Sequence, residues 1–204
     1  MTGPPCRRSH GTVWLVDGSS PGDAGLPATP GPDDGLLGAG RVVGAARWVA
    51  IELFAAVGAW AADDACPAAA VAFAVAARQF AWHADLLADR LPVLAGVDPA
   101  ALTVAPAGWE ALGEVLAVDG TEDRLVVLGR IVLPRLVVAR ARWLSRTGSA
   151  DAALRRALRL VLADEQQTWV SVEALALDHG VDDPAAAAVR AAVPGLSADP
   201  FVPG

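Results

Sequence analysis

The sequence contains no lysine and no tyrosine, and only one methionine and two cysteines among 204 residues. All sixteen basic residues are therefore arginines, a bias typical of a GC-rich genome rather than of one function. Cys6 and Cys66 do not have the spacing of a metal or redox motif, so we expect a reducing compartment. The chain also has no excess of basic charge, since its formal net charge is −7. This balance argues against general nucleic-acid binding.

Long apolar runs are also missing. Apolar charge-free runs cover 53–62 and 65–77, and Arg47 and Glu52 interrupt the most apolar region. A membrane-spanning helix needs about 18–20 apolar residues. No continuous apolar segment follows the two arginines near the N-terminus, as a signal peptide would require. We therefore expect a cytoplasmic protein that binds neither a membrane nor nucleic acid.

What the chain does contain is apolar sequence with helical periodicity. Hydrophobic residues make up 54% and charged residues 19%, which is enough for a packed core. Glycine and proline are dense in residues 1–36, which predicts a disordered tail. Beyond it, a 3.6-residue apolar period without strand alternation predicts an all-α domain at 37–193 and a C-terminal tail at 194–204. The predicted helices cover 40–62, 67–91, 107–118, 121–147, 150–179 and 184–192.

Four of these helices are long, and their connections indicate how they pack. Short links join the first long helix to the second and the third to the fourth, so each pair should be antiparallel. The segment 92–120 is long enough to be a crossover. The helix at 121–147 has two apolar faces, so we expect it to be the most buried. These features predict an antiparallel four-helix bundle with short extra helices.

Three polar residues interrupt the apolar stripes. Glu165 lies within about 20° of the centre of its stripe, so its carboxylate must be paired, bound to a cation or protonated. His83 and Glu52 flank the stripes of the second and first helices. We expect these three side chains to converge in the interior.

Each of the three also has a structural interpretation. Glu165 could form a buried ion pair with Arg130 or Arg135. His83 could be a core histidine bonded to a neighbour, with Gln79 as its support. Glu52 could pair with an arginine on the flank of its helix.

Arginine is concentrated in the second half of the domain. Nine of the sixteen arginines lie between residues 124 and 159. Arg124, Arg135 and Arg142 lie within about 20° of one another on a helical projection, which suggests a ridge that binds an anion or a partner. The alternative is a solvated face with ion pairs to the aspartates at 63, 64, 85 and 89.

Four segments resemble ferritin-like bundle proteins, and in particular bacterial members with a degenerate di-iron motif. The resemblance covers about residues 40–180, and the segments are 47–60 (RWVAIELFAAVGAW), 79–92 (QFAWHADLLADRLP), 129–136 (GRIVLPRL) and 156–169 (RALRLVLADEQQTW). The ferritin-like class often holds two irons with a Glu from each of two helices and Glu-x-x-His from the other two.

The match to that metal motif is partial. Glu52, His83 and Glu165 fit, but Phe80 precedes His83 where the motif has Glu, and Thr168 follows Glu165 where it has His. The resemblance therefore implies at most one iron or manganese ion on Glu52, His83 and Glu165. It also allows a metal-free variant in which arginine replaces the cation.

Two functions follow from these patterns. With a metal, the interior cluster would serve an oxidoreductase or hydroxylase acting on a small molecule; without one, His83 and Glu165 would act as catalytic acid and base. The alternative is a non-catalytic structural or partner-binding module that uses the arginine surface. A homo-oligomer is compatible with both.

Overall fold

The structure, a computed structural model, describes residues 35–181, and this part of the chain contains helices but no strands. The predicted all-α class is therefore confirmed, while the predicted helix at 184–192 and both tails lie outside the described residues. Four helices are long: α1 (Gly35–Asp63), α2 (Pro67–Ala88), α5 (Leu133–Arg146) and α6 (Ala152–Asp178). The shorter elements are η1 (Pro99–Leu102), α3 (Trp109–Leu116), α4 (Thr121–Val126), η2 (Val127–Val132) and η3 (Ser149–Asp151).

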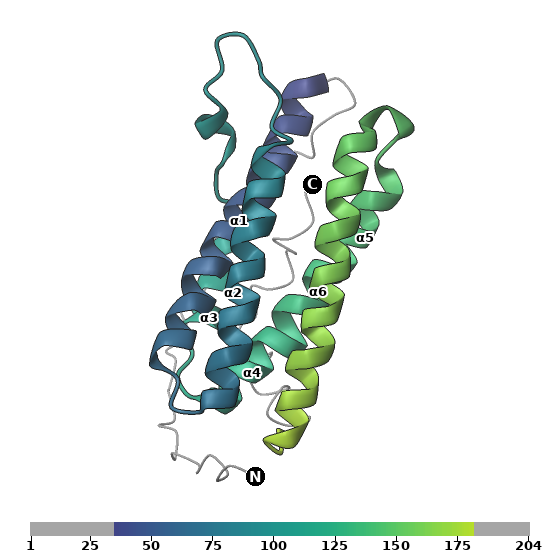
Figure 1. Ribbon diagram of the computed structural model, residues 1–204. Coiled ribbons are helices and arrows are strands. Elements are labelled where there is room, and N and C mark those ends of the chain that lie inside the picture. The colour runs from purple at the N-terminus through teal and green to yellow at the C-terminus, as the bar shows by residue number, and fades with distance from the viewer. Residues whose placement is uncertain (1–34, 182–204) are drawn as a thin grey trace.

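The long helices form two hairpins that lie along a common direction (Figure 1). α1 packs along α2, and α6 packs along the continuous stretch made by α4, η2 and α5. α2 of the first hairpin packs against α6 of the second, and this contact joins the two hairpins. α1 begins at Gly35, before the predicted start at 40, so its first two residues fall within the segment 1–36 that was expected to be a tail.

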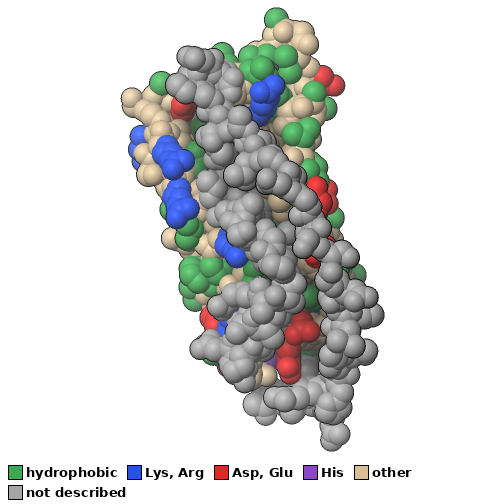
Figure 2. All heavy atoms as spheres, turned by 180° about the vertical axis from the view of Figure 1, so that it is seen from behind, with side chains coloured by type: hydrophobic (Ala, Val, Ile, Leu, Met, Phe, Trp, Pro, Cys, Tyr) green, Lys and Arg blue, Asp and Glu red, His purple; other side chains and the backbone are tan. Residues whose placement is uncertain are grey.

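Charge is distributed unevenly along the molecule. Arg142, Arg146 and Arg156 are exposed near the turn between α5 and α6. Seen from behind, several arginine side chains gather along one side of the upper half (Figure 2). The opposite end carries Asp63 and Asp178, at the ends of α1 and α6. Exposed arginines therefore gather near the turn between α5 and α6, and aspartates lie at the C-terminal ends of α1 and α6.

The segment between α2 and α4 returns along the length of the bundle. α2 has 22 residues and is therefore about 33 Å long. Thr121 at the start of α4 nevertheless donates a hydrogen bond to Asp64, which precedes α2, at 2.8 Å. Residues 89–120 must cover the distance from one end of α2 to the other, as expected for a crossover.

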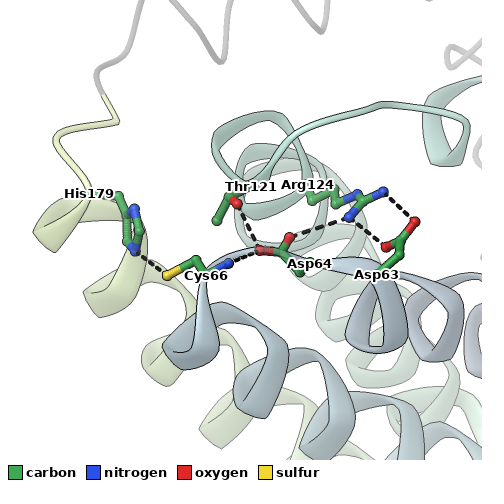
Figure 3. A network of polar contacts seen from close by, with 6 residues as sticks. All are labelled: Asp63, Asp64, Cys66, Thr121, Arg124 and His179. Carbon is green, nitrogen blue, oxygen red and sulfur yellow. Dashed lines mark hydrogen bonds and ion pairs between the residues drawn. The ribbon is translucent and has the colours of Figure 1, made fainter. Parts of the chain in front are cut away.

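A polar network fixes this corner of the molecule (Figure 3). The buried Asp64 carboxylate accepts hydrogen bonds from the Cys66 amide at 2.9 Å, from Thr121, and from Arg124 at 3.3 Å. Both terminal nitrogens of Arg124 also donate to Asp63, at 2.8 and 3.2 Å. The network joins the α1–α2 connection to the start of α4.

The predicted helix at 121–147 is interrupted by a wide turn. Over Val127–Val132 the helix opens to a π-helix, and the Leu133 amide donates to the carbonyl of Leu128, five residues earlier. Pro134 explains the change, because it has no N–H to donate and its ring would clash with a carbonyl of the preceding α-helical turn.

The same stretch is the most deeply buried part of the described chain, as its two apolar faces predicted. Eight apolar side chains between residues 125 and 136 are each at most 2% exposed. Phe80 on α2 and Leu158 on α6 are also buried, whereas Trp169 on α6 is only partly buried against the core. Together these side chains fill the space between the two hairpins.

α1 is long and apolar enough to cross a membrane when only its length and composition are considered. In the structure, 39% of the most apolar stretch of 18 residues in this helix is buried. Val49, Leu53 and Val57 on this helix belong to the core. The core thus accounts for part of the apolar character of α1, and the absence of a membrane partner stays a prediction.

Two glycines of α1 provide a matched test of the packing. A Cβ atom at Gly44 would overlap the carbonyl oxygen of Leu102, whereas at Gly58 the nearest atom, on Ala77, would be 3.8 Å away. Gly44→Ala should therefore lower the free energy of unfolding by about 1–3 kcal/mol. Gly58→Ala should raise it by about 0.5–1 kcal/mol, because alanine favours helix. Chemical denaturation of both variants checks this; equal effects would contradict the close approach of α1 to η1.

The two adjacent aspartates provide a second test. The Asp64 side chain is 0% exposed and that of Asp63 is 64% exposed, although both pair with Arg124. Asp64→Ala should cost about 2–3 kcal/mol of stability because it leaves buried donors without an acceptor. Asp63→Ala should cost at most about 1 kcal/mol, as for an exposed ion pair. Thermal unfolding of the two variants measures the difference in stability. A larger loss for Asp63→Ala would contradict the finding that Asp64 is the buried acceptor of this network.

Candidate functional site

A group of polar side chains lies inside the bundle where α2, α5 and α6 meet. His83 on α2 and Glu165 on α6 are each 2% exposed, and Arg140 on α5 is 3% exposed. Buried charged groups are rare unless they are paired. The inward position of Glu165 agrees with its place on the apolar stripe, and this group is the candidate site.

Glu165 is compensated by Arg140. The Arg140 Nε atom lies 3.5 Å from Glu165 Oε1, which makes an ion pair without a well-formed hydrogen bond. The Arg140 guanidinium also lies 5.9 Å from the centre of the Trp143 ring, within the range of a cation–π contact. The guanidinium therefore has a carboxylate and an aromatic ring as its neighbours.

The expectation that Arg130 or Arg135 pairs with Glu165 was wrong. Arg130 instead pairs with Glu173, with its Nε 3.2 Å from Oε1, and donates to the Val181 carbonyl at 3.1 Å. The arginine that pairs with Glu165 is Arg140, which lies one helical turn beyond the buried Leu136 of α5.

His83 is held in its neutral form. Its Nε2 atom lies 3.2 Å from Asp164 Oδ2 on α6. Burial lowers the pKa of His83 from 6.5 to about 4, although the hydrogen bond with Asp164 acts in the opposite direction. The charge of Arg140 also contributes to this lowering. A neutral ring that donates through Nε2 to a carboxylate carries its lone pair on Nδ1, which is then an acceptor.

Glu165 is shifted in the other direction. Burial, together with the nearby Asp164, raises its pKa from 4.5 to about 7, although Arg140 opposes the change. The carboxyl group therefore exchanges its proton near neutral pH. A pair of titratable groups whose environments move their pKa values in opposite directions is typical of acid–base sites.

Each of these three side chains has a buried polar atom without a hydrogen-bond partner in the described part of the chain. The atoms are His83 Nδ1, Arg140 Nε and Glu165 Oε2. They offer an acceptor, a donor and a carboxyl oxygen that donates or accepts according to its protonation. Because each unsatisfied buried group costs about 1–3 kcal/mol, this arrangement favours the binding of a small polar molecule.

Gln79 does not support His83, contrary to the sequence-based expectation. It accepts a hydrogen bond from Thr168 on α6 instead. This contact lies one turn from the contact between His83 and Asp164 on both helices. The two contacts together fix α2 against α6.

Glu52 lies elsewhere. It lines a hollow of about 410 Å³ between α1 and α3, together with Trp109 and Leu116. Among residues 35–181, no three His, Cys, Asp or Glu side chains are grouped closely enough to hold a metal ion. The structure therefore does not bring Glu52, His83 and Glu165 together as one metal site, and the cation beside Glu165 is a guanidinium.

The predicted ridge of arginines is also not formed. Arg124 is 7% exposed and pairs with Asp63 and Asp64, as the alternative interpretation proposed. Arg135 is partly buried and only Arg142 is exposed. The ridge was inferred from a continuous helix, whereas the wide turn before Pro134 changes the rotation between Arg124 and Arg135.

Arg140 and Asp164 were missed by the sequence reasoning. Arg140 lies on the stripe edge beside Leu136, and Asp164 immediately precedes the inward Glu165. Both positions flank a buried face, so a search for partners of Glu165 and His83 along those edges could have found them.

Comparison of the chain with models of protein families, with curated proteins and with solved structures finds no match in any of the three. Any functional conclusion therefore depends on the geometry of the site itself.

Replacing Arg140 tests its role as the counter-charge. Arg140→Met should cost about 3–5 kcal/mol at pH 8, where the Glu165 carboxylate would be left unpaired in the core. Glu165 has a raised pKa, so its stabilising contribution is present below pH 4.5 and is lost as the pH rises toward 7. The cost of Arg140→Met should accordingly be smaller at pH 5.

The matched control is Arg140→Met combined with Glu165→Leu, which removes the unpaired charge. Urea unfolding at both pH values should show that the double variant recovers most of the lost stability. A pH-independent loss in Arg140→Met, or no recovery in the double variant, would show that Glu165 is not compensated by Arg140.

Proposed function

We propose that the chain is a ferritin-like four-helix bundle whose interior binds a small carboxylic acid at Arg140, Glu165 and His83, with Glu165 as the acid–base group. Two antiparallel hairpins and a crossover between them support the architecture. The three side chains come from the second, third and fourth long helices, so the site lies in the bundle interior.

The observation that carries this proposal is that His83 Nδ1, Arg140 Nε and Glu165 Oε2 are buried without a hydrogen-bond partner in the described part of the chain. The charge of Arg140 acts on both of the other two groups. A carboxylic acid would satisfy all of them. Bound as a carboxylate, it would accept from Arg140 Nε and from protonated Glu165; when Glu165 passes its proton to the ligand, the resulting hydroxyl would donate to His83 Nδ1. Asp164 would hold His83 in the required tautomer.

The donor set does not fit the metal site that the ferritin-like resemblance implies. Arg140 supplies the positive charge next to Glu165, and Glu52 is in a separate hollow. We therefore derive the chemistry from proton exchange at Glu165 alone. Its carboxyl group can protonate a bound acid's conjugate base and take the proton back near neutral pH.

A second candidate is a non-catalytic structural module. It is favoured by the fact that the interior contacts all join two helices: His83 with Asp164, Gln79 with Thr168, and Arg140 with Glu165. In this role the polar contacts would fix the helix register without any ligand.

Binding of acetate separates the two candidates. Acetate should raise the melting temperature of the wild-type protein more at pH 6 than at pH 8, because protonated Glu165 leaves Arg140 available to it. Glu165→Gln should keep binding at both pH values, and His83→Phe should weaken it at least about tenfold. Arg146→Met, at an exposed arginine on the same helix, is the control. No effect of acetate at either pH would favour the structural module.

A further inference from the structure

α6 carries a second apolar stripe on the side opposite the core. Its members are separated by three and four residues in strict alternation, and every one is exposed: Leu160, Ala163, Gln167, Val170, Ala174 and Leu177. Leu160, Val170 and Leu177 are 41%, 70% and 62% exposed. The core side of the same helix is formed by other residues, among them Leu158, Val161 and Val172. α6 is therefore apolar on two opposite faces.

The alternation of three and four residues is the seam of a coiled coil, and differs from the wider face of a helix that packs on a globular core. The seam extends for about 26 Å along α6. α2, which packs against α6, also points Val71, Val75 and Trp82 away from the core. Solvent is an unfavourable environment for an apolar surface of this extent, and such surfaces mark interaction sites.

The charges on α6 indicate what covers the seam. Arg156 and Arg159, both exposed, lie in its first third, whereas the exposed Asp178 is its last residue. Arg156 stands one turn before Leu160 and continues the seam line. A second α6 in the antiparallel direction would bring each basic end next to an acidic end, whereas a parallel one would place like charges together.

We propose that the exposed face of α6 is the dimer interface of this protein, formed with a second copy that runs antiparallel about a two-fold axis near residues 168 and 169. Leu160 then lies opposite Leu177 of the second copy, and Arg156 lies beside Asp178 of the second copy. Gln167, the one polar seam residue, falls next to the axis, where a polar group specifies the register. The interface is isologous and closes at two subunits.

The first experiment places a charge in the seam. Analytical ultracentrifugation of the full-length protein should show a monomer–dimer equilibrium, and Val170→Glu should raise the dimer Kd at least about tenfold. Val138→Glu is the matched control, because Val138 is a 44% exposed valine on the neighbouring helix α5. Circular dichroism melting of both variants shows whether the helices remain folded.

The second experiment tests the antiparallel direction. Arg156→Glu should weaken the dimer about tenfold, since the symmetric contact occurs twice. Combining Arg156→Glu with Asp178→Arg reverses both charges and should restore the wild-type Kd. In a parallel dimer Arg156 would lie beside Arg156 of the second copy, so Arg156→Glu alone would not weaken it.

Several results would overturn the proposal. A wild-type protein that stays monomeric up to millimolar concentration has no such interface. A dimer that Val170→Glu leaves intact uses another face. Sedimentation of monomeric protein with phosphatidylglycerol vesicles, abolished by Val170→Glu, would show that a lipid surface covers the seam instead.

Discussion

The bundle depends on one buried ion pair, the contact between Arg140 on α5 and Glu165 on α6. Neither group is accessible to solvent, and each would carry an uncompensated charge if the other were removed. The pair also determines the state of its neighbours. The positive charge of Arg140 lowers the pKa of His83, and Asp164, which holds that ring, raises the pKa of Glu165. A single guanidinium thus links the titration of groups on α2 and α6.

The buried polar contacts and the apolar core contribute to the fold in different ways. Apolar burial in the stretch from α4 to α5 supplies the large, non-directional stabilisation, with eight side chains at most 2% exposed. The polar contacts are directional and join α2 and α5 to α6, and the Asp64 network joins the start of α4 to the end of α1. Because hydrogen bonds and ion pairs act only in one geometry, they select one helix arrangement among those that bury similar areas.

Much of the helix layout followed from sequence because periodicity and punctuation are local properties. The apolar stripes predicted the long helices, and the stripe centre at Glu165 correctly predicted a buried carboxylate. The partner of this carboxylate, Arg140, could not be predicted in the same way. Several arginines lie on α5, and the rotation of α5 relative to α6 decides which of them reaches Glu165. The predicted places of Glu52 and Arg124 were wrong for related reasons. Glu52 flanks its stripe, and a flanking side chain turns toward whichever neighbouring helix packs there. The wide turn before Pro134 changes the rotation of the helix between Arg124 and the arginines that follow it.

The most direct measurement of the central claim is the titration of the Glu165 carboxyl carbon by NMR, with Glu165→Gln used to assign its signal. A carboxyl beside one guanidinium in the core should titrate near pH 7, well above the usual 4.5. In Arg140→Met with retained fold, the same signal should move to a higher pKa, because the opposing positive charge is gone. A Glu165 signal that titrates near 4.5, or that does not respond to Arg140→Met, would contradict a buried carboxylate compensated by Arg140.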